Sequence, residues 1–172
     1  IDIQKEIEKK FPNMNKKENF LKKSLFKIAK KIVHEDSINQ FLAQNSHLKG
    51  FEFVDAVLDY FDFDYAVSSN DLQNIPTSGK VVIIANHPLG GLDALCLLRL
   101  IGQIRKDVKI VANDFLAGFD ALNSLIITID NYKLKQSKSD IKKIYDALNN
   151  EEALIIFPAG EVSRATPKGI KD

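Results

Sequence analysis

Residues 86–93 read N-H-P-L-G-G-L-D and place a histidine and an aspartate on either side of two glycines. Gly90 and Gly91 permit positive φ angles, so this segment can turn back and bring the Asp93 carboxylate to one imidazole nitrogen of His87. A carboxylate at one nitrogen fixes the tautomer and supports the charge that appears when the ring accepts a proton. His87 and Asp93 therefore have the chemistry of a general base and its orienting group.

A nucleophile to accompany this base is not evident in the chain. The sequence has no G-x-S-x-G motif, and its single cysteine, Cys96, falls within an apolar helical segment. We therefore expect the attacking hydroxyl to come from a substrate. The alternatives are structural: His87 is a capping or core histidine at a helix start, and Asp93 is a helix N-cap.

A second polar segment, P-A-G-E-V-S-R at residues 158–164, follows another apolar run. It offers a glycine amide at Gly160, a carboxylate at Glu161, a hydroxyl at Ser163 and a cation at Arg164. The Arg164 guanidinium suits a phosphate, a carboxylate or a phosphopantetheine arm, or else a surface ion pair. If the strands preceding both segments are parallel, the two loops leave the same sheet edge, where such folds bind ligands.

The elements that would position these loops form an alternating pattern. Apolar strands are predicted at 81–86, 108–113, 125–130 and 153–157, and helices at 94–104, 115–124 and 139–150. A short strand at 63–68 and a polar, turn-rich connector at 69–80 precede them. Strands that alternate with helices predict an α/β fold, with a mainly parallel sheet flanked by helices.

Residues 1–62 are predicted to form an N-terminal helical region, and residues 63–172 are predicted to form an α/β core. Helical periodicity runs through 21–33, 36–44 and 51–61. Ten lysines fall within residues 1–31, so the first of these helices is basic as well as amphipathic. Its apolar stripe either packs on the domain, or lies on a membrane surface with the lysines against anionic headgroups.

Composition narrows the function classes. A length of 172 residues suits one domain, and a net charge of +1 gives no general attraction to nucleic acid. One cysteine excludes an internal disulfide and a multi-cysteine metal site, which fits a reducing compartment. No apolar run reaches the roughly 20 residues that cross a bilayer, and no segment resembles a cleavable signal peptide.

The paired blocks N-H-P-L-G-G-L-D and F-P-A-G-E-V-S-R resemble those of the glycerolipid acyltransferase superfamily, whose best-known members acylate lysophosphatidic acid. More narrowly, they are similar to a bacterial branch described as haemolysins or lyso-ornithine-lipid O-acyltransferases. The superfamily's first block is N-H-x4-D and its third is F-P-E-G-T-R-S. The resemblance covers about residues 80–165.

This resemblance implies an acyltransferase in which His87, positioned by Asp93, deprotonates the hydroxyl of a lysolipid-type acceptor. The oxygen attacks the thioester of an acyl carrier protein or coenzyme A, and backbone amides of the glycine loops stabilise the oxyanion. The chain would need no metal or redox cofactor, and would be cytoplasmic and peripheral on the inner face of the cell membrane. The substrate-binding residues implied are Asn86, Gly90, Gly91, Gly160, Glu161, Ser163 and Arg164.

The sequence departs from the superfamily pattern in four places. Five residues, not four, separate His87 from Asp93. Ala159 replaces the glutamate of the third block, with Glu161 two residues later. Residues 113–120 occupy the place of the second block without its arginine, which favours acceptors that lack a glycerol phosphate. The family's fourth block would lie beyond residue 172, so we expect the C-terminal part of the fold to be missing, through a fragment, a proteolysed chain or a disordered remainder.

Two other function classes remain open. The altered third block fits a non-catalytic lipid or acyl-carrier binding domain with a degenerate active site. Alternatively, N-H-P-L-G-G would serve as the phosphate loop of a nucleotide-binding domain. The sequence has neither G-x-G-x-x-G nor a P-loop lysine, so this last hypothesis is the weaker.

Overall fold

The computed structural model describes residues 34–112, 118–129, 137–159, 164–166 and 169–171. The chain divides into two compact units, residues 1–47 and 48–172. Helix α3 (Glu35–Gln44) lies in the first unit. Helix α4 (Gly50–Tyr60) lies in the second unit, and the predicted division into residues 1–62 and 63–172 stays a prediction.

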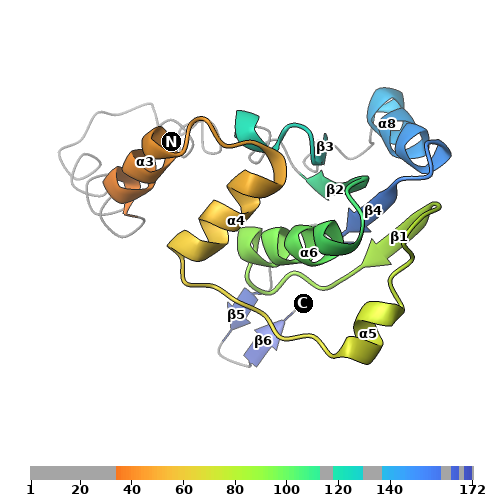
Figure 1. Cartoon of the computed structure of the whole chain (residues 1–172), viewed down its shortest axis with the longest axis horizontal. Helices are drawn as coiled ribbons and strands as arrows, with labels where there is room; N and C mark the ends of the chain where they lie inside the picture. Colours follow the sequence, from red (N-terminus) through yellow and green to blue (C-terminus); the bar gives the residue numbers. More distant parts are fainter. Residues whose placement is uncertain (1–33, 113–117, 130–136, 160–163, 167–168, 172) are drawn as a thin grey trace. The chain divides into compact units, whose positions relative to one another are not determined.

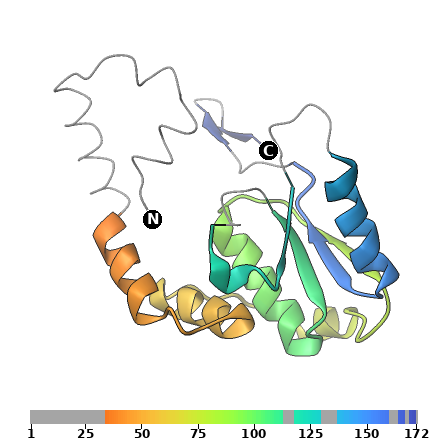
Figure 2. The ribbon, with the colours of Figure 1, turned by 90° about the horizontal axis from the view of Figure 1, so that it is seen from above.

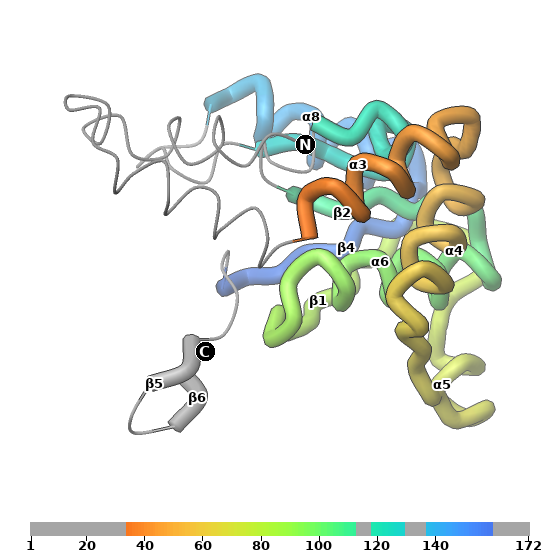
Figure 3. The backbone as a smooth tube through the Cα atoms, turned by 90° about the vertical axis from the view of Figure 1, so that its left-hand side faces the viewer, coloured from red at the N-terminus to blue at the C-terminus, as the bar shows by residue number. Residues whose placement is uncertain are grey.

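A four-stranded sheet forms the centre of the second unit (Figure 1). Its strands are β1 (Val81–Ile84), β2 (Val108–Ala112), β3 (Ile126–Thr128) and β4 (Ala153–Ile156). The order is β1-β4-β2-β3 and every neighbouring pair is parallel. Figure 3 shows β4 between β1 and β2. The predicted α/β fold with a mainly parallel sheet is therefore confirmed.

Helices cover both faces of this sheet (Figure 2). Helix α6 (Gly91–Ile104) packs against β2 on one face and is itself covered by α4. Helix α8 (Lys138–Asn149) packs against β3 and β4 on the other face. Strands buried on both faces need apolar side chains at successive positions, which is why β4 reads as a continuous apolar run.

Several predicted elements differ in detail. Residues 63–68 form no strand; within them the Tyr65 amide donates to the Asp64 carboxylate at 2.8 Å, a local bond of the kind that competes with strand pairing. The expected connector contains a short helix, α5 (Ser69–Gln73), whose first turn is capped by the Ser68 hydroxyl. Part of the helix predicted at 115–124 lies outside the described residues, and the remainder contains a 3₁₀ turn, η2 (Asp120–Leu122).

After β4, the backbone forms a two-stranded antiparallel hairpin of β5 (Arg164–Thr166) and β6 (Gly169–Lys171). Arg164 pairs with Lys171 in this register.

A buried arginine organises the amino-terminal edge of the sheet. The Arg105 side chain is 2% exposed and donates through Nε and Nη2 to the two oxygens of Asp107, both at 2.7 Å. It also donates to the carbonyls of Gly79 (2.7 Å), Pro76 (3.3 Å) and Glu151 (2.8 Å). All five guanidinium N–H donors are thus used. Their hydrogen bonds join the segments that precede β1, β2 and β4.

Replacing Arg105 with methionine should lower the free energy of unfolding by about 3–5 kcal/mol, because three carbonyls and a carboxylate lose their donors together. Equilibrium unfolding in urea measures this loss. Arg99→Met is the matched control: its ion pairs with Asp55 and Asp59 are partly exposed, so we expect a loss of at most about 1 kcal/mol. Equal losses in the two variants would contradict the role given to Arg105.

Candidate active site

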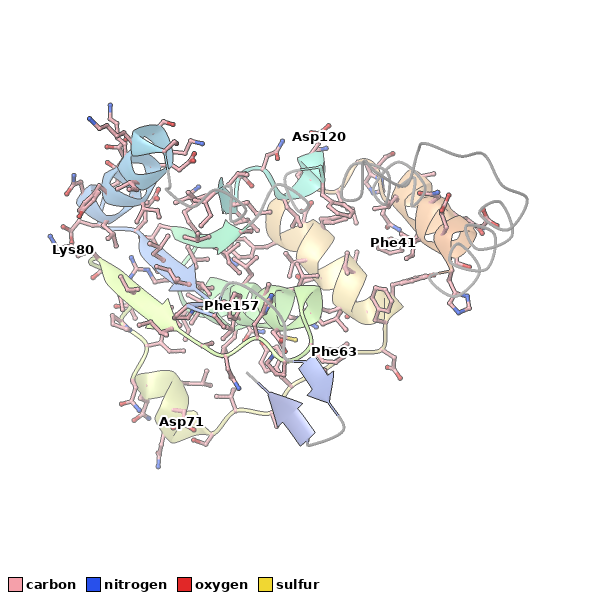
Figure 4. The ribbon with its side chains drawn as sticks, turned by 180° about the vertical axis from the view of Figure 1, so that it is seen from behind. Phe41, Phe63, Asp71, Lys80, Asp120 and Phe157 are labelled. Carbon is pink, nitrogen blue, oxygen red and sulfur yellow. The ribbon has the colours of Figure 1, made fainter. Side chains whose placement is uncertain are left out.

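The pairing of β1 with β4 brings the two predicted loops together. Ile84, the last residue of β1, pairs with Ile156, the last of β4, and the Ala85 amide still donates to the Ile156 carbonyl at 3.3 Å. The chain therefore leaves the sheet twice at one edge, with His87 in the loop after β1 and Phe157 directly after the neighbouring strand β4. Figure 4 labels Phe157 after β4 and, at the opposite end of the sheet, Lys80 before β1.

The loop between His87 and Asp93 turns at Gly90. This residue has φ 75° and ψ −130°, a conformation that favours glycine, and it is the N-cap of α6. Its carbonyl accepts from the Asp93 amide at 3.1 Å, which fixes the first turn of the helix. As a result, His87 Nδ1 lies 3.6 Å from Asp93 Oδ2, with the two side chains 18% and 17% exposed. The five-residue spacing still brings them together.

Asp93 binds the loop backbone more closely than it binds the histidine. Its Oδ2 accepts a hydrogen bond from the Leu89 amide at 2.6 Å. His87 Nδ1 is buried and, among the described residues, has no hydrogen-bond partner. Gly90, not Asp93, is the N-cap of α6, so the N-cap alternative for Asp93 is wrong, while its side chain does lie close to His87. Its charge faces the imidazole, and it also suits the positive end of the α6 dipole.

An aromatic residue completes the surroundings of the histidine. The rings of His87 and Phe157 stack with their centroids 4.1 Å apart and an angle of 22° between their planes. Reasoning from the sequence missed Phe157 as a site residue, although it is the first letter of the F-P-A-G-E block. Its position directly after β4, on the edge where His87 follows β1, was the available signal.

Burial lowers the pKa of His87 below the ordinary histidine value, and the nearby Asp93 carboxylate partly opposes that shift. At neutral pH the ring is therefore unprotonated and can accept a proton. The pKa of the Cys96 thiol is instead raised, first by burial and then by the charge of Asp93. The thiol stays protonated, so it is a poor nucleophile.

The structure describes only some of the other predicted site residues. Asn86 is exposed just before His87, and Gly91 begins α6 with open space where a Cβ would lie. Arg164 is described as the first residue of β5, but its side chain is not. Gly160, Glu161 and Ser163 lie outside the described residues, as does the lysine-rich helix predicted at 21–33.

The described residues contain no group of three or more histidine, cysteine, aspartate or glutamate residues that could hold a metal ion. Within the same ranges, no helix has the length and apolar character needed to cross a bilayer.

A family model described as acyltransferase matches residues 6–172. The chain belongs to this acyltransferase family. Two proteins named lyso-glycine lipid O-acyltransferase, from Bacteroides thetaiotaomicron and Phocaeicola vulgatus, are each 32% identical to it over 173 residues. These matches cover 100% of this chain, which spans 61% and 60% of the two relatives. No solved structure matches the chain.

Replacing Asp93 with asparagine should lower the pKa of His87 further, because the carboxylate charge that stabilises the protonated ring is lost. An asparagine oxygen can still accept from the Leu89 amide, so the loop should keep its shape. An NMR titration of the imidazole measures the shift. Asp71→Asn, which removes a carboxylate from the first turn of α5, is the matched control. An unchanged or raised pKa in Asp93→Asn would contradict this electrostatic account.

Proposed function

We propose that this protein transfers a fatty acyl group from a thioester, acyl-ACP or acyl-CoA, to the hydroxyl of a lysolipid. Membership of the acyltransferase family supports the reaction class, and the two relatives' names support a lysolipid acceptor. The observation that carries the proposal is the placement of His87: its ring stacks on Phe157 and lies beside Asp93 at the sheet edge, where burial favours the unprotonated form that a general base needs.

The reaction uses the two imidazole nitrogens differently. Nδ1 is buried on the Asp93 side, which leaves Nε2 for the substrate. Nε2 takes the proton of the acceptor hydroxyl as its oxygen attacks the thioester carbonyl carbon. When the tetrahedral intermediate collapses, the C–S bond breaks and the imidazolium returns the proton to the leaving thiolate. The products are an ester and a free thiol, and these steps require no metal or redox cofactor.

Backbone amides at the start of α6 are our candidates for stabilising the oxyanion. The first N–H groups of a helix have no partner within the helix, and they lie at its positive end. Gly91 supplies one of them, and no atom lies within 4 Å of where its Cβ would be, so a substrate can approach the backbone. Asn86 and the 160–164 segment, with Glu161, Ser163 and Arg164, are proposed to bind the polar parts of the substrates.

The acceptor we propose is a lyso-amino-acid lipid. The two relatives are named for a lyso-glycine lipid, and residues 113–120 have no arginine for a glycerol phosphate. Two apolar side chains within three residues of His87 in sequence are exposed and suit a lipid chain: Ile84 is 68% exposed and Leu89 is 59% exposed. A lipid acceptor in turn favours a cytoplasmic protein on the inner face of the cell membrane, with the lysine-rich segment of residues 1–31 against anionic headgroups.

An acyl-transfer assay tests the proposal. Purified protein is incubated with acyl-ACP or acyl-CoA and with either lyso-glycine lipid or lysophosphatidic acid, and ester formation is followed by mass spectrometry. We expect transfer to lyso-glycine lipid. For His87→Ala we expect kcat to fall by about 100- to 10,000-fold, which is the rate contribution typical of a general base. His47→Ala, outside the site, should retain full activity.

Two results would reject the proposal. Full activity of His87→Ala would reject the mechanism. Lysolipid binding without turnover, equal in wild type and His87→Ala, would favour a binding domain with a degenerate site.

A further inference from the structure

Phe157 lies at the sheet edge, not within the core. It follows the last residue of β4, and it is partly exposed, whereas Leu154 and Ile155 of the same strand are fully buried. A partly exposed phenyl ring at this edge is not explained by core packing. The aromatic contact the structure gives it is the stacked face of His87, at 4.1 Å between centroids.

The histidine needs a support of this kind. Nδ1 is 3.6 Å from Asp93 Oδ2, which is too long for a hydrogen bond to hold the ring, and Asp93 instead accepts from the Leu89 amide. With its buried nitrogen unbonded, the imidazole lacks the polar anchor that usually fixes the orientation of a catalytic histidine. A flat apolar surface on one face of the ring limits its rotation by van der Waals contact.

We propose that Phe157 is a positioning residue for His87: its ring holds the imidazole plane and keeps water from one face of the base. This deepens the proposed acyl transfer and rests on it for the effect on turnover. The orientation itself belongs to the free protein and can be measured without a substrate.

The charge balance around His87 follows from the same geometry. Asp93, from α6, is the charged group among the described residues that faces the imidazole, and it favours the protonated ring. Phe157, from β4, brings no charge and reduces hydration, which favours the neutral ring. A ring face also attracts a cation, which would favour protonation. Since burial is the largest effect on His87, we expect exclusion of water to dominate.

Two substitutions separate the functions of the phenyl ring. Phe157→Leu keeps an apolar side chain but removes the flat face, while Phe157→Ala removes both. Phe61→Leu is the matched control, because Phe61 is a partly exposed phenylalanine that stacks edge-on with Tyr60 and not with a histidine. Urea unfolding of each variant confirms that it folds.

NMR gives the substrate-free readout. The chain has three histidines, so the His87 resonance can be assigned from its disappearance in His87→Ala. We expect Phe157→Leu to abolish the ring-current shift of the His87 imidazole protons, and Phe157→Ala to raise the pKa of His87 toward its ordinary value. An unchanged imidazole resonance in Phe157→Leu, or an unchanged or lowered pKa in Phe157→Ala, would overturn the proposal.

Turnover gives the second readout. Phe157→Leu should lower kcat by about 10- to 100-fold with little change in KM, since small displacements of a catalytic group are costly. If Phe157→Leu turned over as fast as the wild type, the positioning role would be overturned and the acyltransferase proposal would stand. A wild-type protein with no acyl transfer would instead reject the proposed function, while the NMR results would still decide the role of Phe157.

Discussion

The parallel pairing of β1 with β4 is the constraint on which the site depends. These strands are about 70 residues apart in sequence, yet they end at the same level, with Ile84 opposite Ile156. The loop that carries His87 and the block that begins at Phe157 therefore start side by side. At the other edge, Arg105 joins the segments before β1, β2 and β4, so both ends of the strand pair are fixed.

Two opposing influences on His87 suit a group that must accept a proton and then return it. Burial favours the neutral ring, which can take a proton, and Asp93 stabilises the imidazolium that results. The Leu89 amide holds the Asp93 carboxylate by a 2.6 Å hydrogen bond, so the backbone fixes the position of that charge. In the proposed mechanism the loop sets the electrostatics of the base, and Phe157 sets the plane of its ring.

The sequence predicted the parts of the fold that depend on local pattern. The apolar runs gave all four strands of the sheet, and the N-H-P-L-G-G-L-D loop gave the meeting of His87 with Asp93. It did not predict that β4 lies between β1 and β2, because strand order depends on packing between distant segments. The stacking of Phe157 was missed for that reason. The strand expected at 63–68 does not form, and within this segment the Tyr65 amide bonds locally to the Asp64 carboxylate.

The central claim is that His87 is the general base, and a comparison of two titrations in the wild-type protein tests it most directly. One is the pKa of His87 in the free protein by NMR, and the other is the acid limb of kcat/KM for acyl transfer, which reports the essential base of the free enzyme. We predict that the two coincide below the ordinary histidine value. An acid limb that lies elsewhere, while His87 titrates at its lowered pKa, would contradict the claim.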